Sequence, residues 1–252
     1  MSPFSPKLKI AAVADVHSPK YLSQFIDALS LLPNDIDLFL FAGDMILRGR
    51  VEEFSRVVEA VREIYRGPIV ACFGNEEYDE VIPRLERDYG DEVIWLNDSS
   101  INLTVSGFKL YIVGSRGTLD RPTRWQLKNI SNIREIYEKR VSLIDQLLAE
   151  AGNFDFSILL LHYSPTYKTL VGEIRYIWPE MGCRRLERII VSRKPTVVVH
   201  GHAHKSQVSR VNFDSTVVFN VSLPALGRIT VFELPFKVER QMDLMSFFKR
   251  NS

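Results

Sequence analysis

The 252-residue sequence has little of what marks secreted or membrane-spanning proteins. It has only two cysteines, Cys72 and Cys183, which lie far apart and outside any CxxC spacing. A disulfide framework is therefore not expected, and a reducing compartment fits. The apolar runs are short and broken by Asp or Gly, and none approaches the ~20 residues of a membrane span. The N-terminus lacks the charged and apolar segments of a signal peptide, so we expect a cytoplasmic protein.

The sequence also lacks an excess of charge of either sign. Its 32 basic and 31 acidic residues give a formal net charge of +1, which gives no support for nucleic acid or an anionic membrane as a partner. Hydrophobic residues make up 46% and charged residues 25%, as in ordinary globular proteins. The oligomeric state stays open. We expect Phe247 and Phe248 in the C-terminal tail to pack on the body, with a dimer contact as the alternative.

What is present is an alternation of short apolar runs and amphipathic segments. Residues 10–14, 38–42 and 69–73 are predicted to be buried strands, and the helical spacing of apolar residues in 51–65 predicts a helix between the second and third. This order indicates parallel strands with helices packed on the sheet. Ser106-Gly107 predicts a tight hairpin between two further strands.

The second half of the chain is richer in strands and hairpins. We predict helices at 131–150 and 184–192, and strands at 101–105, 108–113, 156–161, 196–200, 207–211, 216–221 and 228–234. No internal repeat or low-complexity linker interrupts this order. The pattern favours an α/β fold in which two sheets pack face to face with helices outside.

Five short polar stretches each follow an apolar run that is predicted to be a strand. They are Asp15-Val16-His17, Gly43-Asp44, Gly74-Asn75-Glu76, His162, and Gly201-His202-Ala203-His204. Four of the five histidines of the chain lie in these stretches. Because open α/β sheets place their sites at the carboxyl ends of the strands, we expect these side chains to converge.

The residue types in these stretches suit divalent metal ions. Imidazole favours zinc, iron and nickel, and carboxylates favour harder ions such as manganese. Asp15 and His17 lie two residues apart, as do His202 and His204, so each pair projects to one side of an extended chain. Taken singly, Gly-Asp or Gly-Asn after a strand is usually a turn, and His162 is more often a hydrogen-bonded residue than a ligand. Five such strand ends in one chain indicate a metal site.

In their order and spacing, these stretches resemble the motifs D-x-H, G-D, G-N-H-[D/E], H and G-H-x-H of the calcineurin-like metallophosphoesterase superfamily. The resemblance is closest to the small bacterial and archaeal phosphoesterases and spans roughly residues 9–230. It implies a four-layer α/β/β/α sandwich with two mixed sheets packed face to face. It also implies that residues 1–252 form a single domain, because the ligands come from both halves.

The resemblance implies a site for two divalent ions, drawn from Mn²⁺, Fe²⁺, Zn²⁺ and Ni²⁺. The implied ligands are Asp15, His17 and His204 for the first ion, Asn75, His162 and His202 for the second, and Asp44 as the bridge. Such ions, roughly 3.5–4 Å apart, share a hydroxide that attacks phosphorus in line. The expected function is a metal-dependent phosphoesterase that acts on a small phosphoester.

The sequence departs from the family at Glu76, where the motif has histidine. That histidine helps to position the substrate and to protonate the leaving group. An ionised Glu76 near two dications cannot donate a proton, and it repels a dianionic phosphate. We therefore expect phosphodiesters or activated aryl esters to be favoured over alkyl monoesters. The alternative is that Glu76 points away and water protonates the leaving group.

Three further features have weaker signals. Arg116, in a glycine-flanked loop, is the preferred candidate to bind phosphate over Arg48, although a solvated surface arginine is at least as common. His200 is expected to be a packed strand residue outside the site. Residues 163–182 either line the substrate site or form a hydrophobic cap.

Two other functions compete with this one. A catalytically weak or inactive member can serve as a protein-binding scaffold, and the departure at Glu76 allows this. The seven retained ligands argue against it, because a scaffold does not need them. A nuclease gains no support from the near-zero net charge, since extended phosphate contacts need clustered Lys and Arg.

Overall fold

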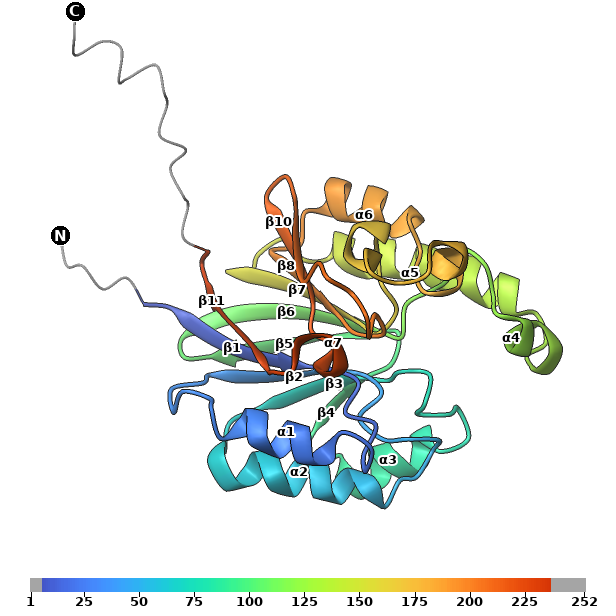
Figure 1. The fold of residues 1–252 in the computed structure, drawn as a ribbon. Helices are drawn as coiled ribbons and strands as arrows, with labels where there is room; N and C mark the ends of the chain where they lie inside the picture. The colour runs from blue at the N-terminus through green and yellow to red at the C-terminus, as the bar shows by residue number, and fades with distance from the viewer. Residues whose placement is uncertain (1–5, 237–252) are drawn as a thin grey trace, which may run out of the picture.

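The computed structural model describes residues 6–236, which form two β-sheets packed face to face with helices on both outer surfaces (Figure 1). The expected packing of Phe247 and Phe248 concerns residues outside this range. Within it, no helix combines the length and the apolar character that a bilayer crossing needs.

The first sheet is mostly parallel. Its strand order is β11-β1-β2-β3-β4, in which β11 pairs antiparallel with β1 and the other neighbours are parallel. The strands are β1 (Leu8–Val13), β2 (Leu38–Ala42), β3 (Ile69–Cys72), β4 (Ile94–Leu96) and β11 (Thr230–Leu234). The predicted parallel half is confirmed, and its carboxyl ends meet at one edge.

The second sheet is also mixed. Its order is β5-β6-β7-β8-β10-β9, with antiparallel pairs at both edges and parallel pairs between them. The strands are β5 (Ser99–Val105), β6 (Phe108–Ser115), β7 (Phe156–Leu161), β8 (Val197–His200), β9 (Arg210–Phe213) and β10 (Thr216–Asn220). Ser106 and Gly107 join β5 to β6 with φ of 49° and 85°, both in the left-handed region, so the hairpin prediction is confirmed.

Helices cover the outer face of each sheet (Figure 1). Below the first sheet lie α1 (Leu22–Leu29), α2 (Glu53–Ile64) and α3 (Ile82–Tyr89). Above the second lie α5 (Ile133–Ala149) and α6 (Arg185–Arg193). The shorter elements are α4 (Arg124–Asn129), η1 (Tyr167–Leu170), η2 (Arg175–Glu180) and α7 (Leu223–Leu226). The result is the expected four-layer α/β/β/α sandwich.

The alternation of side chains along the central strands builds the three apolar layers. In β2, Leu38 and Leu40 face the other sheet, while Phe39 and Phe41 face the helices. In β7, Ile158 and Leu160 face the first sheet, and their neighbours pack under α5 and α6. Because both faces of each central strand are buried, these segments are continuous apolar runs in the sequence.

One predicted strand is shifted. The sequence predicts an extended segment at residues 207–211, but β9 spans Arg210–Phe213. The backbone N–H of Gln207 donates instead to Val171 O, at 2.7 Å, just after η1. The start of the predicted strand therefore pairs with the segment after His162 rather than with β10.

Candidate metal centre

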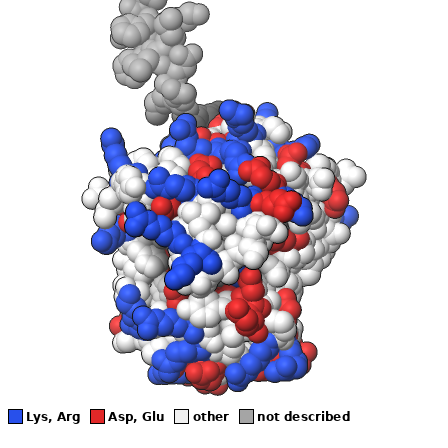
Figure 2. All heavy atoms as spheres, turned by 90° about the vertical axis from the view of Figure 1, so that its right-hand side faces the viewer, with Lys and Arg blue, Asp and Glu red and all other residues white. Residues whose placement is uncertain are grey.

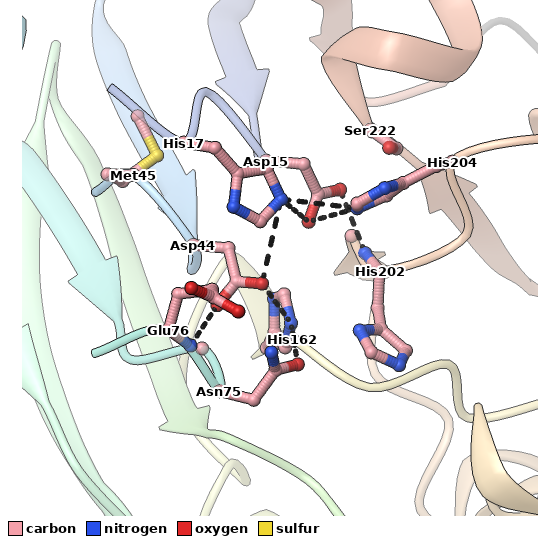
Figure 3. Close-up of polar contacts among 12 residues, drawn as sticks. Asp15, His17, Asp44, Met45, Asn75, Glu76, His162, His202, His204 and Ser222 are labelled. Carbon is pink, nitrogen blue, oxygen red and sulfur yellow. Dashed lines mark hydrogen bonds and ion pairs between the residues drawn. The ribbon is translucent and has the colours of Figure 1, made fainter. Parts of the chain in front are cut away.

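The five polar stretches meet at the edge where the carboxyl ends of both sheets come together (Figure 3). Three of them follow β1, β2 and β3 in the first sheet, and two follow β7 and β8 in the second. Backbone hydrogen bonds tie these turns together, from Asp15 N to Gly43 O at 3.0 Å, from His17 N to Asp44 O at 2.9 Å and from Gly201 N to His162 O at 3.1 Å. The convergence predicted from the strand ends is therefore present.

Asp15, His17 and His204 form the first group that could hold a metal ion. Asp15 Oδ1 lies 3.2 Å from His204 Nε2 and 3.9 Å from His17 Nε2, and the two imidazole nitrogens are 3.4 Å apart. The other carboxylate oxygen, Asp15 Oδ2, accepts from the backbone N–H of His202 at 2.9 Å. This bond fixes the carboxylate so that Oδ1 faces the two imidazoles.

Asp44, His162 and His202 form a second such group in the described chain. His162 Nε2 lies 3.3 Å from Asp44 Oδ2 and 3.1 Å from Asn75 Oδ1. On the opposite side of the ring, His162 Nδ1 lies 2.9 Å from Ala42 O, a carbonyl that can only accept. Nδ1 therefore carries a proton, and Nε2 is the nitrogen that faces the site and can offer its lone pair when the ring is neutral.

Asp44 lies between the two groups (Figure 3). Its Oδ1 accepts from the backbone N–H of Glu76 at 2.7 Å, which orients the carboxylate. Its Oδ2 is 3.3 Å from His162 Nε2 in the second group and 3.8 Å from His17 Nε2 in the first. One oxygen atom therefore faces ligand atoms of both groups, as a bridging carboxylate must.

The backbone at these strand ends is held in strained conformations. Asp15, His17, Asp44 and His202 have φ of 62°, 43°, 54° and 67°, in the left-handed region that non-glycine residues rarely adopt. Strain of this kind persists only where the surrounding structure enforces it, and it is concentrated at functional sites. Gly43, at φ 81°, has no room for a side chain, since a Cβ there would lie 2.8 Å from His162 Nδ1.

The burial and charge of the site shift the pKa values of its side chains. Burial by itself lowers the pKa of His162, but the adjacent Asp44 carboxylate outweighs it and raises that pKa to about 9. Burial lowers the pKa of His202 to about 3. Burial raises the pKa of Asp15, but the adjacent His204 imidazole, with Nε2 at 3.2 Å from Oδ1, outweighs it and lowers that pKa below its usual range. Without a metal, the His202 imidazole of the second group is therefore neutral, whereas the His162 imidazole is protonated.

The chemistry of the donors fits divalent ions. Asp15 Oδ1 is buried and has no hydrogen-bond partner among the described residues, which is costly for a carboxylate oxygen. It faces two imidazole nitrogens that lie within hydrogen-bond distance of each other. Unshared electron pairs of oxygen and nitrogen thus point to one place, and a divalent cation satisfies them together.

Glu77 is a buried residue of the site for which the sequence predicts no role. Its carboxylate accepts from the backbone N–H groups of Asp44 (2.8 Å), Met45 (2.7 Å), Ile46 (3.2 Å) and Gly74 (2.7 Å). Burial and the nearby Asp44 carboxylate raise the pKa of Glu77 to about 7, while its N–H donors act in the opposite direction. Glu77 therefore holds the turn that carries Asp44 against the turn after β3.

We expect Glu77→Gln to destabilise the fold. A glutamine has one carbonyl oxygen, so its amide NH₂ faces N–H groups that lose their acceptor. The free energy of unfolding should fall by about 1–3 kcal/mol, measured by urea denaturation. Glu80→Gln, at an exposed glutamate in the same loop, is the matched control and should leave it unchanged. Equal stability of the two variants would show that Glu77 does not hold the turn.

Glu76 and Arg116 lie around this centre. The Glu76 carboxylate accepts from the backbone N–H of Arg48 at 2.7 Å, and the residue lies beside Asp44 and Asn75 (Figure 3). The Arg116 guanidinium donates to Asp79 Oδ1 and to Glu77 O, both at 2.8 Å. In this arrangement Arg116 supports the backbone of Glu77. Its role in binding phosphate stays a prediction.

The remaining sequence predictions concern packing. His200 is fully buried, with Nδ1 at 2.8 Å from Gly201 O and Nε2 at 2.9 Å from Thr169 Oγ1, so it is a packed strand residue as expected. Cys72 and Cys183 are buried free thiols. In the segment after His162, Leu170 and Met181 pack on Ala203, as expected of a hydrophobic cap, and Tyr163 borders a cavity beside the site. That this segment lines the substrate site stays a prediction.

This fold and this site define a class of α/β sandwich proteins with two candidate metal-ligand groups at the carboxyl ends of their strands. A family model described as calcineurin-like phosphoesterase matches residues 8–206. The chain belongs to that family, and the resemblance seen in its motifs is confirmed. Among curated proteins, no sequence matches significantly.

Solved structures share the fold at low sequence identity. The phosphopantetheinyl hydrolase PptH of Mycobacterium tuberculosis has a TM-score of 0.69 at 15% identity, covering 92% of this chain and 97% of that one. GAP50, described as the anchor in the inner membrane complex of Plasmodium, has a TM-score of 0.59 at 12% identity, and the match covers 91% of this chain and 82% of GAP50. TT1561 of Thermus thermophilus has a TM-score of 0.53 at 13% identity, and the match covers 90% of this chain and 99% of TT1561. These likenesses confirm the fold alone.

Proposed function

We propose that this protein is a metal-dependent phosphoesterase with a dinuclear site. The observation that carries the proposal is the position of Asp44, whose Oδ2 faces ligand atoms of both candidate groups. Divalent ions held there would lower the pKa of water and supply positive charge to the oxygens of a phosphoryl group. Manganese, iron, zinc and nickel all accept such a mixture of nitrogen and oxygen ligands.

Each ligand has a distinct task in this proposal. Asp15, His17 and His204 would hold the first ion, and His162 and His202, with Asn75, the second. Asn75 contributes a neutral amide oxygen, which lies 3.1 Å from His162 Nε2. With one neutral oxygen ligand in place of a carboxylate, the loaded site keeps net positive charge for an anionic substrate. Asp44 would hold the two ions close despite their mutual repulsion.

Glu76 supports a preference for phosphodiesters or activated esters. It lies next to Asn75 and borders the cavity beside the second group. A carboxylate there repels a dianionic monoester more strongly than a monoanionic diester. A carboxylate at position 76 also cannot protonate the leaving group, so a poor leaving group must take its proton from water.

Replacing Glu76 by His should raise the hydrolysis of an alkyl monoester such as glycerol phosphate. The imidazolium can protonate the leaving oxygen, and general acid catalysis contributes roughly 10²–10⁴-fold, so we expect a gain of at least about 10-fold in kcat/KM. Phosphate release measures it. Glu80→His, at an exposed neighbour, is the control and should show no gain. An unchanged or lower rate for Glu76→His would contradict the role given to this position.

The function itself is tested by metal analysis and by hydrolysis of bis-(p-nitrophenyl) phosphate with added Mn²⁺. Two bound ions per chain and turnover support the phosphoesterase. The second candidate is a catalytically inactive, protein-binding scaffold, which the description of GAP50 as an anchor makes worth testing. Absence of both metal and turnover would favour the scaffold. The buried Asp15 Oδ1, which has no hydrogen-bond partner within residues 6–236, argues against the scaffold. Burying such an oxygen costs free energy, and a protein that binds no metal gains nothing in return.

A further inference from the structure

A cavity of about 310 Å³ opens directly beside the second candidate metal group. Asn75 and His202 of that group form part of its lining, so a molecule in the cavity lies next to a phosphoryl group held at the site. Its size is at the lower end of the range for small-molecule pockets. The cavity is therefore suited to the organic part of a small phosphoester.

Aromatic rings make up much of the cavity wall. Tyr163, Tyr78 and Trp125 all line it; Tyr163 is buried, while Tyr78 and Trp125 have 38% and 63% of their surface exposed. Trp125 is held in place by α4, whose N-terminus is fixed by reciprocal hydrogen bonds between Thr123 and Gln126. The exposed Trp125 indole is therefore held in the cavity wall, where it can contact a ligand.

The charged side chains that line this cavity are all acidic. The charged residues that line it are Glu76 and Glu180, and no Lys or Arg among the described residues does. Arg121 pairs with Glu180 at 3.0 Å, whereas Glu76 accepts a backbone N–H and forms no ion pair in the described part of the chain. Figure 2 shows Lys and Arg in patches on the face toward which the carboxyl ends of the parallel strands point, with uncharged residues and some Asp and Glu nearer its centre.

We propose that the cavity binds an organic cation, such as a quaternary ammonium group, carried by the alcohol part of the phosphodiester substrate. This inference rests on the phosphoesterase function proposed above. Aromatic faces attract cations through their negative quadrupole, and a nearby carboxylate adds to the attraction. A second phosphate or a carboxylate on the substrate would instead meet Glu76 without a cation in the described wall to pair with it.

The proposal is tested with three p-nitrophenyl phosphodiesters that share one leaving group. Their second alcohols are choline, its neutral isostere 3,3-dimethylbutanol, and the anionic 2-sulfoethanol. We expect kcat/KM to fall in that order, with choline ahead of its isostere by about 5- to 30-fold, as cation–π contacts of 1–2 kcal/mol imply. Equal rates for choline and its isostere, or a sulfoethyl ester as fast as either, would overturn the proposal. If bis-(p-nitrophenyl) phosphate is not hydrolysed either, the phosphoesterase function has failed instead.

A binding measurement tests the cavity apart from turnover. Choline should change the tryptophan fluorescence of the metal-loaded protein at lower concentration than 3,3-dimethylbutanol does. Trp125→Ala should lose this difference and the substrate preference. Leu127→Ala, at an exposed residue of the same helix that does not line the cavity, should keep both. Identical behaviour of the two variants would show that the Trp125 indole is not the binding surface.

Discussion

Replacing Asp44 by Asn should lower kcat/KM for bis-(p-nitrophenyl) phosphate on the order of 10³-fold, at the upper end of the loss seen when one transition-state donor is removed. The carboxylate Oδ2 faces both His17 and His162, and an amide carries no charge with which to join two dications. We expect metal analysis to show fewer than two ions per chain in the variant.

The fold of this variant should survive, which makes the test specific. Glu77 binds the turn through the backbone N–H of Asp44, and that bond does not depend on the side chain. Asp88→Asn, on the outer surface of α3, is the control and should keep full activity. If Asp44→Asn keeps more than a tenth of the activity together with both ions, Asp44 does not bridge them.

The convergence of the candidate ligands could be predicted from the sequence because each of them follows a strand end that is encoded locally. A buried strand needs an uninterrupted apolar run, and the first polar residue after the run marks its carboxyl end. His162 follows β7 directly, and Asp44 comes two residues after β2. A run that is apolar on both faces then marks a central strand. Local pattern therefore determined both the fold and the place where the side chains meet.

The structural role of Glu77 could not be predicted from the local sequence pattern. Three of the four N–H groups that it binds lie more than 30 residues away, at Asp44, Met45 and Ile46. Nothing in the residues around Glu77 indicates these partners, because a glutamate in a polar loop is usually solvated. The acidic position at the end of the G-N-H-[D/E] motif, which Glu77 occupies, is the signal in the sequence that points to it.

The short elements were missed for a different reason. The helices α1 and α3 each span eight residues and have no side-chain cap, so they depend on tertiary packing rather than on local signals. The strand β4 has three residues, too few to show a period. The helix α4 did carry a local signal, since Thr123 and Gln126 form a capping box. This capping box is the sequence feature that places Trp125 on a helix.

Removal of the metal ions should abolish hydrolysis and lower the melting temperature. An ion at 100 times its dissociation constant stabilises the protein by about 2.7 kcal/mol, and a chain of this size shifts by roughly 2–4 °C per kcal/mol, so we expect a fall of about 5–10 °C for each ion lost. Scanning calorimetry before and after EDTA measures this change. Adding Mn²⁺ back should restore both properties, and an unchanged melting temperature would contradict a metal site of this affinity.

The size of that fall should depend on pH because protons and metal compete for His162. Asp44 raises the pKa of His162 to about 9, above its ordinary value of 6.5, despite burial. In the metal-free protein, the stability gained from the protonated pair is therefore full below about pH 6.5 and lost as the pH rises through 9. Metal binding needs the deprotonated ring, so it strengthens over the same interval. The difference in melting temperature between loaded and metal-free protein should widen from pH 6.5 to 9, and a difference that narrows would show that His162 is not a ligand.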